Sequence, residues 1–313
     1  MNKQILATCK MLSGYYAFIF LVLLTTSCNV NSKKNNNEKE EALRDSIHFK
    51  SGYARLSDLN MYYEIYGEGK PIVLIHGGGS TIQTSFGRII PYFSKHRQII
   101  AVELQGHGHT ADVDRPESFE QDADDVAALL KYFNIDRADF FGFSNGGNTT
   151  MQIAIRHPNL VRKIILASAF FKRTGMIAPF WGSMKNASID NMPEQLKVEY
   201  KKVAPDTSGL IKMFTKDRNR MLDFVDWNAE DIHSIQAPTL IISADEDVVR
   251  PEHAVEMYRL IPNSQLAIFP GGHGKYMGEI TTLSGGTRDY LLIVPLIEEF
   301  LDKEEKGQTG KAD

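Results

Sequence analysis

The chain has 313 residues, 42% of them hydrophobic and 24% charged, a composition that is typical of globular proteins and excludes a wholly disordered or fibrous chain. Its net charge of −4 offers no basic excess for binding nucleic acid through phosphate contacts. The two cysteines, Cys9 and Cys28, both lie near the N-terminus, so the rest of the sequence excludes a disulfide framework and a cysteine-based zinc site.

The segment 1–27 has the pattern of a secretory signal peptide. Lys3 and Lys10 precede an apolar run at 15–24, which is about half as long as a membrane-spanning helix. The small residues that lead into Cys28 resemble a bacterial lipoprotein cleavage box. That resemblance implies that Cys28 is lipidated and anchors the chain to a membrane of the bacterial cell envelope, facing the periplasm or the exterior. A plain secretory signal with an incidental cysteine, or an uncleaved anchor, is the alternative.

Residues 28–46 are predicted to form a flexible tether, because they are rich in Asn, Ser, Lys and Glu and almost free of apolar side chains. A random coil of this length spans roughly 20–25 Å. The folded body is expected at 47–302, followed by a polar tail at 303–313.

The body alternates predicted strands and helices. Two β-runs at 50–56 and 59–66 predict a hairpin. Short apolar runs predict buried strands at 72–75, 99–102, 138–143, 164–166, 240–242 and 266–269. Helices are predicted at 118–133, 149–157, 252–260 and 291–301. A capping box of Ser118 and Gln121 opens the first helix. This order predicts an α/β fold, with a mostly parallel central sheet, helices on both faces and a ligand site at the carboxyl ends of the strands.

The stretch at about 170–231 interrupts this alternation because it contains no convincing strand. It begins with apolar side chains between Phe170 and Met184 and continues with charged helical segments. We expect a helical cap inserted between two strands of the sheet. Its apolar start forms either a wall of the ligand pocket or the core of the cap itself.

The segment 142–146 reads Gly-Phe-Ser-Asn-Gly and fits the pattern Gly-x-Ser-x-Gly where a predicted strand meets a helix. A serine on such a sharp turn has strained backbone geometry, and the flanking glycines let the chains approach closely. The next backbone N–H, that of Asn145, lies at a helix N-terminus, where it can stabilise an oxyanion. The motif predicts Ser144 as a catalytic nucleophile. An ordinary glycine-rich turn is the alternative.

With this motif the sequence resembles the α/β-hydrolase fold superfamily, in its serine-hydrolase branch with a helical cap, over about residues 50–302. The His-Gly-Gly-Gly segment at 76–79 and the Gly-His-Gly segment at 106–108 also carry the resemblance. It implies that the backbone N–H groups of Gly78 and Asn145 form an oxyanion hole. No metal or organic cofactor is implied. His76 is expected to hold its loop rather than to react.

The acid and the base are expected after the last two strands of the sheet. Of the three adjacent acids at 245–247, the resemblance favours Asp247, because it precedes an apolar pair that leads to Pro251. Asp245 is the alternative. His273 lies between glycines in the loop after the last strand and is the expected base.

Three further features leave open questions. His107 and His109 form a His-x-His pair that could ligate a metal, although no cysteine or carboxylate pair completes such a site nearby. Asn145 stands where the family more often has a larger apolar residue or Gln, which predicts an additional polar group beside the oxyanion hole. The segment 274–289 is longer than a simple loop and is expected at the rim of the pocket.

These residues predict a Ser144–His273–Asp247 triad that cleaves a small carboxylic ester or lactone through an acyl-enzyme. Carbon–carbon bond hydrolysis of a β-diketone-like substrate is the second hypothesis, and a non-catalytic binding lipoprotein is the third. The expected partner is a small-molecule substrate. Nucleic acid is not expected to bind, and a membrane is expected to be contacted through the lipid anchor alone.

Overall fold

The computed structural model describes residues 47–283 and 290–304. The predicted signal peptide at 1–27, the tether at 28–46 with its lipidated Cys28, and most of the predicted tail lie outside the described residues. Among the helices that are described, none is long and apolar enough to cross a membrane.

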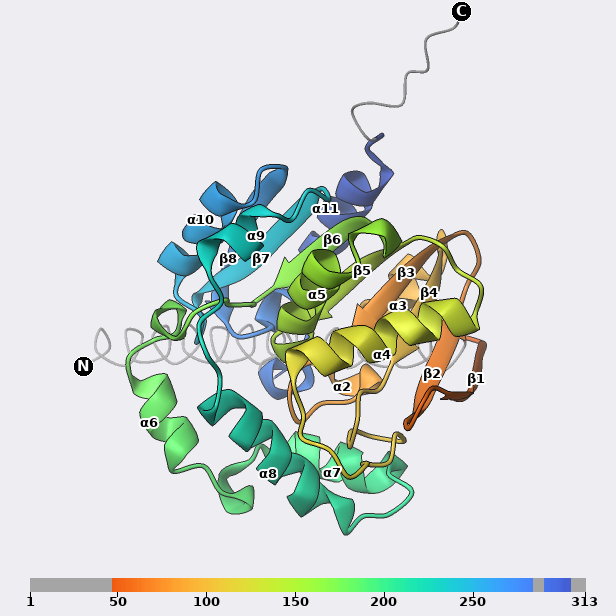
Figure 1. The fold of residues 1–313 in the computed structure, drawn as a ribbon, viewed down its shortest axis with the longest axis vertical. Helices are drawn as coiled ribbons and strands as arrows, with labels where there is room; N and C mark the ends of the chain where they lie inside the picture. Colours follow the sequence, from red (N-terminus) through yellow and green to blue (C-terminus); the bar gives the residue numbers. More distant parts are fainter. Residues whose placement is uncertain (1–46, 284–289, 305–313) are drawn as a thin grey trace, which may run out of the picture. The chain divides into compact units, whose positions relative to one another are not determined.

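An eight-stranded sheet in the order β1-β2-β4-β3-β5-β6-β7-β8 is the framework of the body (Figure 1). Strands β3 to β8 pair in parallel, whereas β2 pairs antiparallel with both β1 and β4. The strands are β1 (Phe49–Arg55), β2 (Asn60–Tyr66), β3 (Lys70–Ile75), β4 (Arg97–Val102), β5 (Ala138–Phe143), β6 (Val161–Ala167), β7 (Thr239–Glu246) and β8 (Ser264–Gly272). The sheet confirms the predicted α/β fold, and each predicted strand falls within an observed one or within two residues of it.

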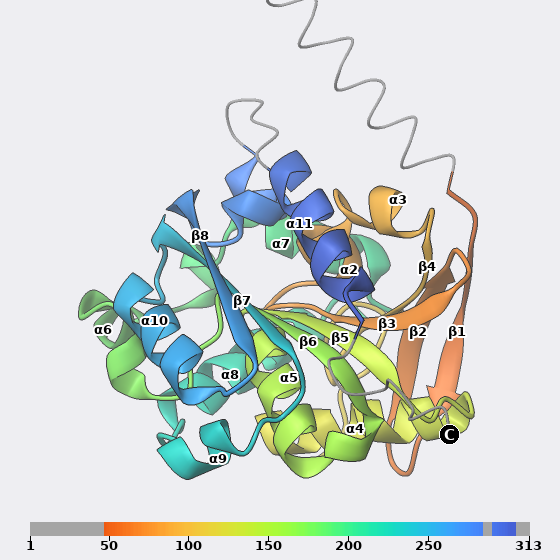
Figure 2. The same ribbon diagram turned by 90° about the horizontal axis from the view of Figure 1, so that it is seen from above.

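Helices cover both faces of this sheet (Figure 2). One face carries α4 (Phe119–Tyr132), α5 (Asn145–Arg156) and α9 (Ala229–His233). The other carries α2 (Ile82–Phe86), α3 (Ile90–Phe93) and α11 (Tyr290–Asp302). The remaining helix of the sheet region, α10 (Pro251–Leu260), packs beside β7 and β8.

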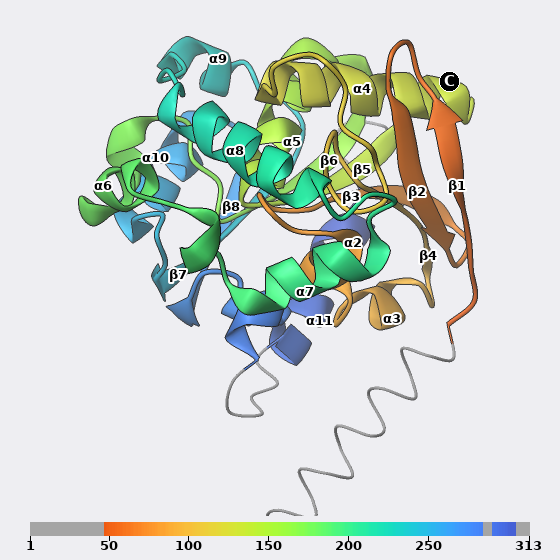
Figure 3. The same cartoon turned by 90° about the horizontal axis from the view of Figure 1, so that it is seen from below.

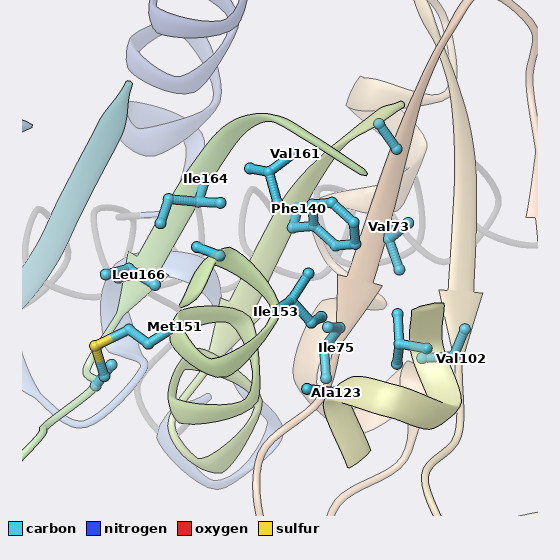
Figure 4. Packing of buried hydrophobic residues seen from close by; sticks show 14 of the residues in the cluster. Val73, Ile75, Val102, Ala123, Phe140, Met151, Ile153, Val161, Ile164 and Leu166 are labelled. Carbon is cyan, nitrogen blue, oxygen red and sulfur yellow. The ribbon is translucent and has the colours of Figure 1, made fainter. Parts of the chain in front are cut away.

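The main core lies between the sheet and the helices α4 and α5 (Figure 4). Residues on one side of the strands point into it, as Val73 and Ile75 of β3 do, and α5 contributes Met151 beside Leu166 and Ile153 near Ile75. Each large aliphatic side chain that becomes fully buried in this way stabilises the fold by about 1.5–3 kcal/mol. The pairing of short apolar strands with amphipathic helices therefore fixes the sheet, and the sheet fixes the strand ends that carry the site.

The N-terminus of α4 differs from the predicted capping box. Ser118 Oγ accepts a hydrogen bond from the Gln121 N–H at 3.1 Å, which is the first half of the box. The Gln121 side chain instead donates to Asp125 Oδ1 at 3.0 Å. The second half of that prediction is wrong, because a charged acceptor one turn along the helix competes for the amide.

The start of α5 also differs from the prediction. The helix begins at Asn145 rather than at 149, so two glycines lie in its first turn. Gly146 is needed there, because a Cβ on this residue would lie 2.1 Å from Ile75 O. Close packing of α5 on β3 outweighs the poor helix propensity of glycine.

The cap emerges between β6 and β7, and its elements are helical (Figures 1 and 3). It contains α6 (Pro179–Lys185), α7 (Glu194–Val203) and α8 (Gly209–Leu222). Two apolar clusters hold it together. The first contains Phe170, Met176, Met221 and Phe224, and the second contains Met192, Leu196, Tyr200, Leu210 and Met213.

Candidate active site

Ser144 occupies a strained turn between β5 and α5. Its backbone angles are φ 54° and ψ −121°, a conformation that L-residues rarely adopt and that costs about 1–3 kcal/mol. The turn is so tight that a Cβ at Gly142 would lie 2.0 Å from Gly146 O. Backbone hydrogen bonds from Ser144 N–H to Ala167 O at 2.8 Å, and from Gly147 N–H to Ser144 O at 2.8 Å, hold this geometry.

Asp247 and His273 lie side by side at the ends of β7 and β8. His273 Nδ1 is 2.7 Å from Asp247 Oδ1. The Asp247 side chain is 0% exposed and that of His273 is 31% exposed, so the acid is enclosed while the ring reaches the cavity. The other candidate, Asp245, accepts a hydrogen bond from Gly271 N–H at 2.7 Å and is exposed.

A second pair of side chains supports Asp247 from behind. Ser168 Oγ donates to Asp247 Oδ2, and the Tyr276 hydroxyl lies 2.6 Å from Ser168 Oγ. Ser168 follows β6 with φ 50°, which turns its hydroxyl toward the acid. Val249 N–H donates to Asp247 Oδ1 at 3.2 Å. The carboxylate therefore has a partner on each oxygen and a fixed orientation.

The acid and the base shift one another's protonation. Burial raises the pKa of Asp247, but His273 and the hydrogen bonds offset this, and the pKa lies below its ordinary value. Burial lowers the pKa of His273, whereas the Asp247 carboxylate and, to a smaller extent, Glu279 together raise it by more, so the pKa lies above its ordinary value. The pair favours an ionised acid next to a histidine that binds a proton readily, as a general base requires.

Ser144 and His273 face the same cavity, of about 360 Å³, between the strand ends and the cap. Among the described residues, no hydrogen bond joins Ser144 Oγ to the ring of His273. Such contacts are often long in unliganded enzymes and tighten in the substrate complex. The ring of His273 packs on Phe143, the residue before Ser144, with ring centroids 4.8 Å apart.

The loop after β3 brings the predicted oxyanion donors to the same place. A Cβ at Gly77 would lie 3.2 Å from Ser144 Cβ, so this loop touches the serine turn directly. Gly78 and Asn145 both line the cavity, and Asn145 is the first residue of α5. Among the described residues, the Gly78 N–H has no hydrogen-bond acceptor, whereas the Gly79 N–H donates to Asp217 Oδ2 at 2.5 Å.

Asp217 of the cap helix α8 is buried next to this loop. It accepts hydrogen bonds from His107 Nε2 at 3.1 Å and from Asn145 Nδ2 at 3.3 Å, and it forms an ion pair with Arg220. Burial lowers the pKa of His107, but Asp217 more than offsets this and leaves a pKa of about 9. Burial raises the pKa of Asp217, but Arg220 and, after it, His107 lower it by more, so that the pKa of this carboxyl lies far below its usual range. The Gly79 N–H lies 3.2 Å from His107 Nε2 as well.

The His-x-His pair does not form a metal site in the described part of the chain. His107 contacts Asp217, whereas His109 Nδ1 lies 2.8 Å from Glu103 Oε2. No group of three or more potential ligands occurs among the described residues. His76 holds its loop as expected, since Nδ1 bonds Gly77 O at 2.8 Å and Nε2 accepts from Leu104 N–H at 3.1 Å.

The walls of the cavity are mainly apolar. They include five methionines of the cap, which are Met176, Met184, Met192, Met213 and Met221. Phe170 and Phe180 from the apolar start of the cap line the cavity as well. Phe170 also belongs to the cap core, so both hypotheses for this stretch hold at once. Residues 274–283 do not line the cavity directly, but Ile280 packs against the second cap cluster, whose Met192 and Leu196 do, and 284–289 lie outside the described residues.

Comparison with known proteins places these features in a family. The family model described as "alpha/beta hydrolase fold" matches residues 70–211. A 2-hydroxy-6-oxo-2,4-heptadienoate hydrolase from Pseudomonas putida is 30% identical over 230 residues, which cover 65% of this chain and 82% of the relative. A pimeloyl-(acyl-carrier protein) methyl ester esterase from Neisseria meningitidis is 28% identical over 265 residues, which cover 77% of this chain and 80% of the relative.

A solved structure agrees with these relatives. Est816, described as an N-acyl homoserine lactone degrading enzyme, has a TM-score of 0.62 and 25% identity, and the match covers 80% of this chain and 100% of that one. The sheet and these relatives define an enzyme of the hydrolase class. The chain belongs to the α/β hydrolase fold family, as the motifs of the sequence implied.

The sequence did not reveal several residues that the structure adds to the site. Asp217 lies in a charged helix, and its neighbours in sequence give no sign that it reaches Gly79 and Asn145. Ser168 and Tyr276 were missed for the same reason. One available signal was the predicted strand end at 164–166, since residues that follow parallel strands gather at one edge of a sheet.

Proposed function

We propose that the protein is a serine hydrolase that cleaves small, uncharged carboxylic esters or lactones. The observation that supports this most is the contact between the buried Asp247 and His273, in a cavity that Ser144 shares. The strained turn at Ser144 adds support, because such geometry persists where it exposes a nucleophile. The named esterase and lactone-degrading relatives carry out chemistry of this class.

In the proposed reaction, Ser144 Oγ forms a bond to the substrate carbonyl carbon while its proton passes to His273 Nε2. The backbone N–H groups of Gly78 and Asn145 stabilise the oxyanion, and the N-terminal end of α5 adds to this. When the tetrahedral intermediate collapses, the ester C–O bond breaks, and the alkoxide that leaves takes the proton from His273. Water then attacks the acyl-enzyme, gives a proton to His273, and releases the acid as Ser144 regains its proton.

The walls of the cavity favour an uncharged substrate. Arg218 supplies the one Lys or Arg side chain among the residues that line it. Its guanidinium already donates to Met184 O at 3.1 Å and to Lys185 O at 2.6 Å. These carbonyls leave its charge in place, so Arg218 is the one Lys or Arg side chain of the lining that a substrate carboxylate could meet, and burying such a carboxylate against the apolar rest of the walls would cost several kcal/mol.

The apolar lining of the cavity also bears on the two alternative functions. The heptadienoate of the Pseudomonas putida relative is named as a carboxylate, and in this mainly apolar cavity such an anion would have Arg218 as its one Lys or Arg contact. Carbon–carbon hydrolysis therefore remains second. A non-catalytic binding lipoprotein remains third, because it gives no reason for the strain at Ser144.

A matched pair of esters tests the substrate class. We expect methyl pentanoate to be hydrolysed with a kcat/KM at least about tenfold above that of monomethyl glutarate, which has the same length but carries a carboxylate. Short lactones should be hydrolysed as well. A fluorophosphonate should label Ser144, as peptide mass spectrometry can show. Equal or better hydrolysis of the anionic ester would contradict the substrate class, and labelling elsewhere would contradict the mechanism.

We also propose that Cys28 carries a lipid anchor. The support is the sequence pattern of 1–28 alone, since this segment lies outside the described residues. Two or more acyl chains hold a protein on a membrane stably, whereas one does so marginally. Intact mass analysis of the protein from its native host should find a diacylated Cys28 at the N-terminus, and Cys28→Ser should release the enzyme from the membrane fraction. An unmodified Cys28 would contradict the anchor but not the hydrolase.

A further inference from the structure

The cap reaches the oxyanion loop through one carboxylate. Asp217 of α8 accepts the Gly79 N–H at 2.5 Å and the Asn145 side-chain amide at 3.3 Å. Gly79 belongs to the loop that follows β3, 138 residues away in the sequence, and Asn145 follows the serine. A single cap side chain therefore contacts both segments that carry the proposed oxyanion donors.

The loop needs such an anchor because three glycines in succession form it. Glycine has the greatest backbone freedom of all residues, so the peptide between Gly78 and Gly79 can rotate at little steric cost. Gly79 has φ +64°, a conformation that its N–H contact with Asp217 helps to select. At its other end, this peptide accepts a hydrogen bond at Gly78 O from Ser80 Oγ at 3.4 Å. A rotated peptide would turn the Gly78 carbonyl and shift the Gly78 residue itself, whose own N–H belongs to the preceding peptide and is the proposed oxyanion donor.

Asp217 is itself saturated and neutralised. Oδ2 accepts from Gly79 and His107, and Oδ1 accepts from Asn145 and Arg220. With four polar contacts, one of them the ion pair with Arg220, the carboxylate does not need a cationic group from the substrate. Its negative charge is paired with Arg220, a cation that Asp217 shares with Asp122.

The same network ties the cap to the body of the enzyme. Arg220 also donates to Asp122 Oδ2 of α4 at 2.7 Å, and both side chains are 3% exposed. Removing one partner of a buried charged network is far more costly than replacing the whole network. The position of α8, and with it that of Asp217, is therefore fixed relative to the strand ends.

We propose that Asp217 is a positioning residue, through which the cap holds the glycine loop and Asn145 in the arrangement of a working oxyanion hole. The proposal rests on the proposed function, and it adds that the cap contributes to the rate of the chemical step as well as to the walls of the cavity.

Asp217→Asn tests the proposal, with Asp223→Asn as the matched control at the exposed end of the same helix. Each carboxylate oxygen of Asp217 accepts two hydrogen bonds. The side-chain amide of asparagine replaces one of these oxygens with an NH₂ group, so in either orientation of the amide a donor would face two other donors. We expect kcat to fall by about 10²-fold, as when an oxyanion donor is lost, while KM changes by less than about threefold. Asp223→Asn should leave both constants unchanged.

A transition-state analogue separates positioning from a general loss of structure. An aryl trifluoromethyl ketone adds to Ser144 and places an oxyanion in the hole, so its Ki should rise by the same factor as kcat falls. If Asp217→Asn does not fold, Asn145→Ala is the second test, because it removes one donor to Asp217 and keeps the backbone N–H. We expect kcat to fall by about tenfold and the Ki of the ketone to rise by the same factor.

Two outcomes overturn the proposal. The first is an unchanged kcat in a folded variant, and the second is a fall in kcat without a matching rise in the ketone Ki. These outcomes are distinct from failure of the proposed function, because that failure would appear in the wild-type enzyme as an absence of ketone inhibition and of labelling at Ser144.

Discussion

Replacing Ser144 with alanine is expected to lower ester turnover by on the order of 10⁶-fold, the scale seen when a triad serine is removed. The change removes one oxygen and no packing, and among the described residues the Ser144 hydroxyl holds no other side chain. The unfolding temperature should therefore stay within about 2 °C of the wild-type value. Hydrolysis of p-nitrophenyl acetate and thermal unfolding by circular dichroism measure the two quantities.

Ser168→Ala is the control for this variant, because Ser168 lines the same cavity and supports Asp247. Its loss removes one hydrogen bond to a charged group, so a fall of about tenfold is expected. Undiminished turnover in Ser144→Ala would refute the proposed nucleophile, and the proposed function with it.

Asp247→Asn is expected to lower kcat by about 10⁴-fold, because an amide stabilises the wrong tautomer of His273 and cannot balance its positive charge. Asp245→Asn is the matched control. Asp245 is exposed and accepts one backbone hydrogen bond, from Gly271, so its loss should change kcat by less than about threefold.

The pH profile gives an independent measure of the same contact. His273 must be neutral to act as a base, so kcat/KM falls as the pH drops through its pKa. Asp247 raises that pKa in the wild-type enzyme. The acidic limb of the profile should therefore move to lower pH in Asp247→Asn and stay in place in Asp245→Asn. The reverse pattern would assign the acid to Asp245.

The parts of the site that could be predicted from the sequence are those that local patterns specify. The turn at Ser144 has a short signature, because a strand, two close-packed glycines and a helix must follow one another directly. The places of the strands were predictable, since buried parallel strands are continuous apolar runs, although β7 extends four residues and β8 three residues beyond the predicted ends. The position of His273 was predictable for a similar reason, because it lies between glycines directly after the last apolar run.

What local patterns could not supply is the choice among neighbours and the contacts between distant segments. Asp245 and Asp247 are alike in the sequence, and burial on the folded sheet distinguishes them, since one side chain is exposed and the other is 0% exposed. Asp217 lies 72 residues from Asn145 along the chain, and no periodicity connects the two. Its role depends on how the cap docks, which is a property of the tertiary structure.

The insertion of the cap between β6 and β7 has a consequence for evolution and engineering. An insertion at one loop can in principle diverge or be exchanged without altering the order of the strands, and exchange of caps is an obvious route to new substrate ranges. In this protein the inner side of α8 limits that freedom, because Asp217 and Arg220 are joined to the glycine loop and to α4. A grafted cap without this pair would bring a new pocket but remove the carboxylate that Gly79 N–H contacts, so a successful chimera should retain both residues while the methionine-rich walls vary.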